Sequence, residues 1–197
     1  SGYKLSFSDN SSNNCIRFKT NEKLGEEGYE IEVDDRQISL SAATEKGMFY
    51  AIQTFFQLLP AEIESAKPLK MKLSVPAVKI ADHPRFSYRG VMIDVSRHFF
   101  TVEELKKQIS VMAMLKLNRL HLHLTDNQGW RIAIDKYPQL VEYSAVQETY
   151  NEELYGPCYY TKEDIKELVA YADRHHIEVI PEIEFPGHSL SALVPFP

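Results

Sequence analysis

The sequence predicts an α/β fold, with a small α+β domain at residues 1–81 followed by a parallel α/β domain at residues 82–197. Three observations predict it. Short runs in which apolar residues alternate with polar ones are separated by segments with apolar residues at helical spacing. All 7 histidines and the single tryptophan, Trp130, lie at or after His83. Pro84 biases the residue before it toward extended backbone, so we place the domain boundary at Ala81–Asp82.

In the first domain, residues 28–33 and 37–42 alternate between apolar and polar side chains, which predicts two strands joined by a turn at Asp34–Asp35. Residues 45–59 carry apolar side chains at helical spacing, and Pro60 ends the predicted helix. Residues 70–75 alternate again and predict a further strand. We interpret this domain as a scaffold.

In the second domain, the pattern of apolar residues predicts three strands, at residues 88–95, 118–125 and 177–183. A capping box at Thr101–Glu104 begins the first intervening helix, and Thr161–Asp164 begins the second. Strands that alternate with helices in this way predict parallel strands with right-handed crossovers.

Composition narrows the range of functions. The chain has 197 residues, 44% of them hydrophobic, and a net charge of −6 without a basic run, so nucleic acid is not an expected partner. No stretch approaches the roughly 20 apolar residues that span a membrane. Cys15 and Cys158 form neither a CxxC pair nor a disulfide framework. A barrel of about 250 residues does not fit in this length together with a companion domain.

Polar side chains follow each of the three strands of the second domain. In parallel α/β folds, ligands bind at the carboxyl ends of the strands, so this face is the expected site. The three ends carry, in chain order, Asp94, Ser96, Arg97 and His98, then His123, Asp126, Asn127, Gln128, Trp130 and Arg131, then Glu182, Glu184 and His188.

The chemistry of that site stays open at this point. His121 and His123 lie two apart on a strand and could be a metal pair, or two interior histidines held by hydrogen bonds. Asp126 and His188 could form a pair in which the carboxylate orients the imidazole. Trp130 could stack on a sugar ring or pack in the interior.

Three motifs carry a resemblance to a known family. The segments HPRFSYRGVMIDVSRHF (83–99), NRLHLHLTDNQGWR (118–131) and EIEFPGH (182–188) resemble the first three barrel strands and loops of glycoside hydrolase family 20, the β-N-acetylhexosaminidases. The segment GMFYAIQT (47–54) is similar to the α+β domain that precedes this barrel. The resemblance implies the first three βα units of an incomplete (β/α)₈ TIM barrel, truncated after strand 3.

The resemblance also implies an activity. Members of this family release terminal β-linked N-acetylglucosamine or N-acetylgalactosamine from glycans, and the acetamido oxygen of the substrate acts as the nucleophile. A Glu protonates the leaving oxygen and the Asp before it orients the acetamido group, so no metal or cofactor is expected. Bacterial members are often periplasmic, at the cell surface or secreted.

Residue roles follow from the same resemblance. Arg89 matches the arginine that binds the hydroxyls of the sugar, and its planar fork suits two adjacent oxygens. Asp126 and His188 match a pair that supports the catalytic acid. The further candidates are Asp94, for which structural support is the alternative, and His123, Trp130 and Glu184. The family often has Asp where this chain has Asn127.

The catalytic Asp-Glu pair is expected after a fourth strand, and the chain ends at Pro197. We therefore expect an inactive fragment that needs the remainder of its own barrel. Two other hypotheses stay open. One is a non-catalytic carbohydrate-binding remnant that kept the Arg89 region, and the other is a metal-dependent barrel hydrolase that uses His121 and His123.

Overall fold

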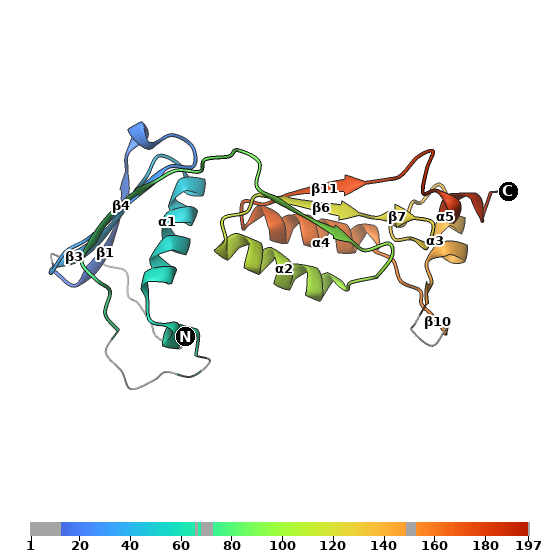
Figure 1. The fold of residues 1–197 in the computed structure, drawn as a ribbon, viewed down its shortest axis with the longest axis horizontal. Coiled ribbons are helices and arrows are strands. Elements are labelled where there is room, and N and C mark those ends of the chain that lie inside the picture. The colour runs from blue at the N-terminus through green and yellow to red at the C-terminus, as the bar shows by residue number, and fades with distance from the viewer. Residues whose placement is uncertain (1–12, 66, 68–72, 149–152, 197) are drawn as a thin grey trace. The chain divides into compact units, whose positions relative to one another are not determined.

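The computed structural model of the chain describes residues 13–65, 67, 73–148 and 153–196 (Figure 1). The chain divides into two compact units, Ser1–Ser87 and Tyr88–Pro197, which we call the N-terminal and C-terminal units. The division follows Ser87 and not Ala81, because residues 78–82 still pair with a strand of the N-terminal unit.

The N-terminal unit contains one four-stranded sheet in the order β1-β3-β2-β4. Strands β2 (Tyr29–Val33) and β3 (Gln37–Ala42) are antiparallel, as predicted. Asp34 forms the turn between them, because its Oδ1 accepts hydrogen bonds from the backbone N–H groups of Arg36 and Gln37 at 2.7 and 2.8 Å. Strand β1 (Cys15–Thr20), which pairs parallel to β3, was not predicted.

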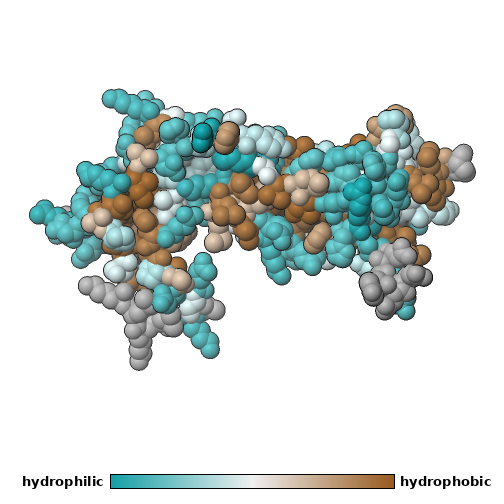
Figure 2. Space-filling model, viewed as in Figure 1, coloured by the Kyte–Doolittle hydropathy of each residue, from teal (hydrophilic) through white to brown (hydrophobic). Residues whose placement is uncertain are grey.

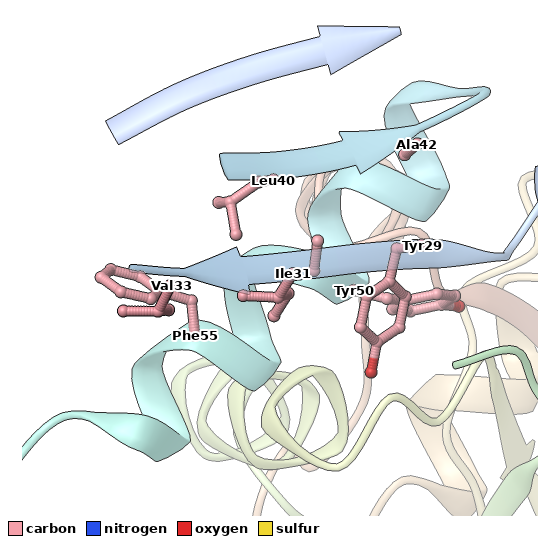
Figure 3. Packing of buried hydrophobic residues seen from close by; sticks show 8 residues of the cluster. Tyr29, Ile31, Val33, Leu40, Ala42, Tyr50 and Phe55 are labelled. Carbon is pink, nitrogen blue, oxygen red and sulfur yellow. The ribbon is translucent and has the colours of Figure 1, made fainter. Parts of the chain in front are cut away.

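Helix α1 (Glu45–Leu58) packs its apolar side chains against this sheet (Figure 3). Thr44 caps the helix, since its side chain accepts a hydrogen bond from the N–H of Gly47. The core contains side chains from β2, β3 and α1, namely Tyr29, Ile31, Val33, Leu40, Ala42, Tyr50, Ala51 and Phe55. Two short 3-10 helices, Glu22–Leu24 and Ala61–Glu64, complete the described part of the unit.

The last strand of this unit differs from the prediction. Residues 70–72 of the predicted strand lie outside the described residues, and residues 73–75 are not in a strand. The strand is instead β4 (Val78–Asp82), which pairs antiparallel with β2. Burial along β4 does not alternate cleanly, so its sequence gives only a weak strand pattern.

The C-terminal unit is built on a three-stranded parallel sheet in the order β11-β6-β5. These strands are β5 (Gly90–Asp94), β6 (Arg119–His123) and β11 (Glu178–Glu182), within the predicted ranges. Helices α2 (Val102–Met114) and α4 (Lys162–Asp173) connect them and pack against each other on one face of the sheet (Figure 1). The predicted mixed α/β fold is confirmed.

Both helices begin at capping boxes. The Thr101 side chain accepts from the N–H of Glu104, whose carboxylate accepts from the N–H of Thr101. Thr161 and Asp164 make the same pair of bonds in α4. Leu105 and Ile109 of α2 and Leu168 of α4 are fully buried, so the sheet face that carries Leu120 and Leu122 is covered.

Smaller elements lie beyond the carboxyl ends of the parallel strands. A hairpin of β7 (Thr125–Asp126) and β8 (Gly129–Trp130) follows β6 directly. Helix α3 (Gln139–Ser144), the paired strands β9 (Gln147–Glu148) and β10 (Leu154–Tyr155), and helix α5 (Leu190–Leu193) complete this end. Apart from Thr125, which lies in the predicted strand at 118–125, none of them was predicted, because each has six residues or fewer and shows no clear period.

Apolar residues also reach the surface of the C-terminal unit. Apolar surface is visible over this unit in the space-filling view (Figure 2). Val91 and Met92 on the edge strand β5, and Ile183 directly after β11, are exposed. Among the described residues, no helix is long and apolar enough to cross a membrane.

Candidate active site

The parallel register places three ionisable residues side by side at the carboxyl edge of the sheet. Asp94 of β5 is opposite His123 of β6, and His123 is opposite Glu182 of β11. Side chains at the same level of neighbouring strands point to the same face of a sheet. The register therefore brings two carboxylates and an imidazole together from three strands.

Asp126 lies at the centre of this group, and its side chain is only 1% exposed. Oδ2 lies 2.9 Å from His123 Nε2 and 2.6 Å from Arg97 Nη2. Oδ1 accepts from the N–H of Asn127 at 2.6 Å and lies 3.1 Å from His188 Nδ1. The structure thus brings Asp126 and His188 together, 62 residues apart in sequence.

Burial alone would raise the pKa of Asp126. The hydrogen bond from Asn127, the hydrogen bond from His123 and the charge of Arg97 together outweigh burial and hold that pKa below its usual value. Asp126 is therefore a buried anion with several donors around it. When His188 donates its Nδ1–H to this anion, Nε2 carries the lone pair of the neutral ring.

His123 bridges two carboxylates. Its Nε2 faces Asp126 at 2.9 Å and its Nδ1 faces Glu182 Oε1 at 2.8 Å. Burial favours the neutral ring, but the hydrogen bonds to Asp126 and Glu182 outweigh that effect and raise the pKa of His123. Two ionised carboxylates can only accept hydrogen bonds, so an imidazolium satisfies both contacts at once.

Glu182 and Glu184 share a hydrogen bond between their side chains. This bond lowers the pKa of Glu182 and raises that of Glu184, so Glu184 is the acid that holds the proton more readily. His121 Nε2 contacts the second oxygen of Glu182. Glu184 is also anchored through its N–H, which donates to Thr125 Oγ1 at 3.0 Å.

The geometry changes the expected metal ligands. Among the described residues, His123, Glu182 and Glu184 have potential ligand atoms within 4.8 Å of one another, and His121 is not part of that group. The His121–His123 pair considered as an alternative is thus not the group of potential ligands that these residues form. The three side chains already contact one another or Asp126.

His188 reaches Asp126 from the segment that follows β11. The residue has a φ of 52°, in the left-handed region that is uncommon for a residue with a side chain. Its side chain is 55% exposed, in contrast to that of Asp126. Asn127 helps to hold the segment, because its Oδ1 accepts a hydrogen bond from the N–H of Leu190 at 3.1 Å.

Asp94 and Arg97 form a turn directly after β5. Asp94 Oδ1 accepts from the N–H groups of Ser96 and Arg97 at 3.0 and 2.9 Å, and its Oδ2 pairs with the Arg97 guanidinium. The structural role considered for Asp94 is therefore the one that the contacts support. Arg97 is the cation of the site, 46% exposed and bonded to Asp126 through Nη2.

Arg89 does not lie at this site. It directly precedes β5 (Gly90–Asp94), so it lies at the amino end of the strand, whereas Asp94 ends it. Its Nε donates to the carbonyl of Lys116 at 2.8 Å, and its N–H donates to Asn118 Oδ1 at 2.9 Å. The expectation that Arg89 binds the sugar does not fit this position, because a strand of five residues separates it from the edge that carries Asp126.

Trp130 is 6% exposed, and its indole N–H donates to the carbonyl of Ile132 at 2.7 Å. These contacts favour the packing role over the sugar-stacking role. Sequence reasoning placed Arg97 and Arg131 at the strand ends without giving either a role. Position beyond the carboxyl end of a strand was the available signal for Arg97, whereas nothing in the sequence indicated that Arg131 is fully buried.

Both units match models of one family. Residues 1–83 match "Glycosyl hydrolase family 20, domain 2", and residues 86–197 match "Glycosyl hydrolase family 20, catalytic domain". The class is that of the glycoside hydrolases. The chain belongs to glycosyl hydrolase family 20.

Named relatives agree with this assignment. The chain is 47% identical over 174 residues to a beta-hexosaminidase of Porphyromonas gingivalis, an alignment that covers 88% of the chain and 22% of the relative. It is 40% identical over 192 residues to a beta-hexosaminidase of Vibrio furnissii, covering 92% and 30%. The chain thus spans less than a third of the length of either relative.

Solved structures are similar as well. The GH20 beta-N-acetylhexosaminidase of Streptomyces coelicolor A3(2) is 40% identical with a TM-score of 0.89, covering 98% of this chain and 38% of that one. The GH20 exo beta-N-acetylglucosaminidase of Vibrio harveyi, solved with N-acetylglucosamine, is 37% identical with a TM-score of 0.84, covering 92% and 29%.

Proposed function

We propose that the whole protein is an exo-acting β-N-acetylhexosaminidase that hydrolyses terminal β-linked N-acetylglucosamine or N-acetylgalactosamine with retention of configuration. The observation that carries this proposal is the buried Asp126 anion, which holds His188 at the carboxyl edge of the parallel sheet. Membership of family 20 and the names of the relatives support the substrate class.

The C-terminal unit is proposed to be the first three βα units of a (β/α)₈ barrel, and the N-terminal unit its companion domain. Sequential parallel strands lie in the spatial order β5, β6, β11, and α2 and α4 cover the same face. A barrel places its helices on one side in this way, whereas a doubly wound sheet carries helices on both. The exposed apolar residues on β5 and after β11 are expected to be covered by the remainder of the barrel.

The reaction is proposed to need no protein nucleophile. The acetamido oxygen of the substrate attacks the anomeric carbon as the glycosidic bond breaks, and a Glu from a later strand donates a proton to the leaving oxygen. Water then opens the cyclic intermediate and returns the proton to that Glu. Two inversions at the same carbon retain its configuration.

Asp126 and His188 act behind that acid in the proposed mechanism. The Asp126 carboxylate fixes the His188 tautomer in which Nδ1 carries the proton, so Nε2 can accept a hydrogen bond from the catalytic acid. A hydrogen bond from the protonated acid to Nε2 stabilises the protonated form of that acid, so the pair tunes the pKa at which the acid gives up its proton. His123 and Arg97 keep Asp126 charged and therefore support the pair indirectly.

Arg97 is proposed to take the sugar-binding role that was expected of Arg89. It presents a half-exposed guanidinium at the carboxyl edge of β5, where ligands bind in such folds. A planar fork can donate to two neighbouring hydroxyl oxygens while its other N–H groups stay paired with carboxylates.

The isolated 197-residue chain is proposed to be inactive, because the proton donor and the acetamido-orienting Asp belong to later strands. The test compares the isolated chain with the whole protein on 4-nitrophenyl N-acetyl-β-glucosaminide, and follows the anomer released by proton NMR. Release of the β-anomer by the whole protein alone is expected. A whole protein that binds N-acetylglucosamine without hydrolysing the substrate would support the carbohydrate-binding remnant instead.

A further inference from the structure

Arg131 is fully buried and donates only to neutral oxygens among its contacts in the described part of the chain. Its three nitrogens lie 2.7–3.2 Å from the carbonyl oxygens of Val95, Ser96, Val146 and Cys158 and from Oε1 of Gln147. The acceptors come from two stretches of chain: the turn after β5, and the described residues Val146, Gln147 and Cys158. One guanidinium therefore ties these two stretches together.

A buried cation of this kind is costly. Removal from water disfavours the charged form and lowers the pKa of Arg131, and no carboxylate among these contacts offsets that cost. An apolar side chain of similar volume would avoid this cost but would leave the same buried oxygens without donors. Arg131 therefore satisfies these oxygens, and its rigid fork also fixes two backbone segments in one geometry.

The turn that Arg131 holds is the one that carries Arg97. Ser96 O receives bonds from both Nε and Nη2 of Arg131, at 3.2 and 2.7 Å. Gln147 adds a second tie, because its Nε2 donates to Arg97 O at 3.1 Å and its Oε1 accepts from the N–H of Phe99 at 3.0 Å. The backbone on both sides of Arg97 is therefore tied, through Arg131 and Gln147, to Val146 and Cys158.

Gly129 of β8 gives Arg131 the room it needs. A Cβ added at this glycine would lie 2.4 Å from both Cζ and Nη2 of Arg131. Because the guanidinium is held by the hydrogen bonds described above, it could not move aside without giving some of them up. An alanine at this position would displace Arg131 without changing its charge.

We propose that Arg131 is a positioning residue for Arg97: it locks the Ser96–Arg97 backbone so that the Arg97 guanidinium faces both Asp126 and the sugar. This inference rests on the proposed function, because it assigns Arg131 to the same site. Arg131 acts through the backbone of Arg97 and does not itself contact the substrate.

The test is a double-mutant cycle in the whole protein, with Arg131→Lys, Arg97→Lys and the double variant. The readouts are kcat and KM on 4-nitrophenyl N-acetyl-β-glucosaminide and the Kd of N-acetylglucosamine. Arg131→Lys is expected to lower kcat/KM by roughly 10- to 100-fold, mainly through KM and with a parallel rise in Kd, as misplacement of a binding group by about 1 Å does. In the Arg97→Lys background the same change is expected to cost less than about threefold.

Three further variants distinguish the positioning role from a general loss of stability. Leu168→Ala creates a cavity under α4, away from the turn, and is expected to lower the unfolding temperature while leaving KM unchanged. If Arg131→Lys does not fold, Gly129→Ala and Gln147→Ala replace it in the cycle, since each disturbs the tie without removing the buried charge.

The outcomes separate the two claims. The positioning role is overturned if the wild-type protein is active and the double variant loses kcat/KM by the product of the two single losses. That result leaves the proposed function intact. A wild-type protein that neither hydrolyses the glycoside nor binds N-acetylglucosamine overturns the proposed function, and this inference falls with it.

Discussion

Replacing Arg97 and Arg89 one at a time with alanine separates the two possible sugar-binding arginines. Arg97 is 46% exposed, so solvent screens its ion pairs with Asp94 and Asp126, and they contribute little to stability. Its bonds to sugar hydroxyls would be charge-assisted and worth about 1.5–3 kcal/mol. Because each 1.4 kcal/mol corresponds to about a factor of ten, Arg97→Ala is expected to lower kcat/KM by roughly 10- to 150-fold.

Arg89→Ala is the matched control. It removes the bond from Nε to the carbonyl of Lys116 at the amino end of β5, and is expected to cost about 1 kcal/mol of stability. Its kcat/KM should stay within about threefold of wild type, since no ligand binds at that end of a parallel strand. The assay is steady-state hydrolysis of 4-nitrophenyl N-acetyl-β-glucosaminide by the whole protein, with urea unfolding of each variant. A large loss in Arg89→Ala together with an active Arg97→Ala would refute the reasoning.

The remaining predictions concern the possible need for a metal, the buried carboxylate of Asp126 and the N-terminal cap of α4. A chelator is expected to leave kcat/KM unchanged, whereas a loss that added Zn²⁺ or Mn²⁺ restores would favour the metal-dependent reading. Asp126→Asn is expected to lower the unfolding free energy at pH 7 by about 1–3 kcal/mol, because the buried His123 Nε2 loses its charged acceptor. Since the folded pKa of Asp126 lies below its unfolded value of about 3.9, this deficit should be full above pH ~4 and shrink as the pH falls further, which urea titrations at several pH values measure. Thr161→Ala removes the cap of α4 and is expected to cost about 0.5–2 kcal/mol in urea unfolding with kcat/KM unchanged; unaltered stability would show that the capping box is not a stabilising feature.

The main helices and strands could be predicted from the sequence. Strong alternation predicted β2 and β3, the helical spacing after Thr44 predicted α1, and the capping boxes at Thr101 and Thr161 predicted where α2 and α4 begin. These signals are local, so they can be interpreted without knowledge of the tertiary structure. Edge strand β1 was missed because its burial does not alternate: most of its residues are exposed.

The site was harder to predict from the sequence than the fold, because its contacts join residues that lie far apart along the chain. Chain order placed Asp126 and His188 at neighbouring strand ends, and their hydrogen bond required only that the strands be parallel. The sugar-binding role of Arg89 stays a prediction that its position at the amino end of β5 does not favour, because a motif does not say at which end of the strand its arginine lies. The side chain of Arg131 could not be assigned, since burial of a charge among carbonyl oxygens leaves no pattern in the sequence.

The central claim is that Asp126 and His188 support the protonation of a catalytic acid. The pH dependence of kcat/KM for the wild-type whole protein and for His188→Ala tests it most directly, because that profile reports the ionisation of the essential groups in the free enzyme. The account predicts a lower rate and a shifted profile in His188→Ala, since the acid loses the imidazole that Asp126 holds in place. A reduced rate with an unchanged profile would contradict it.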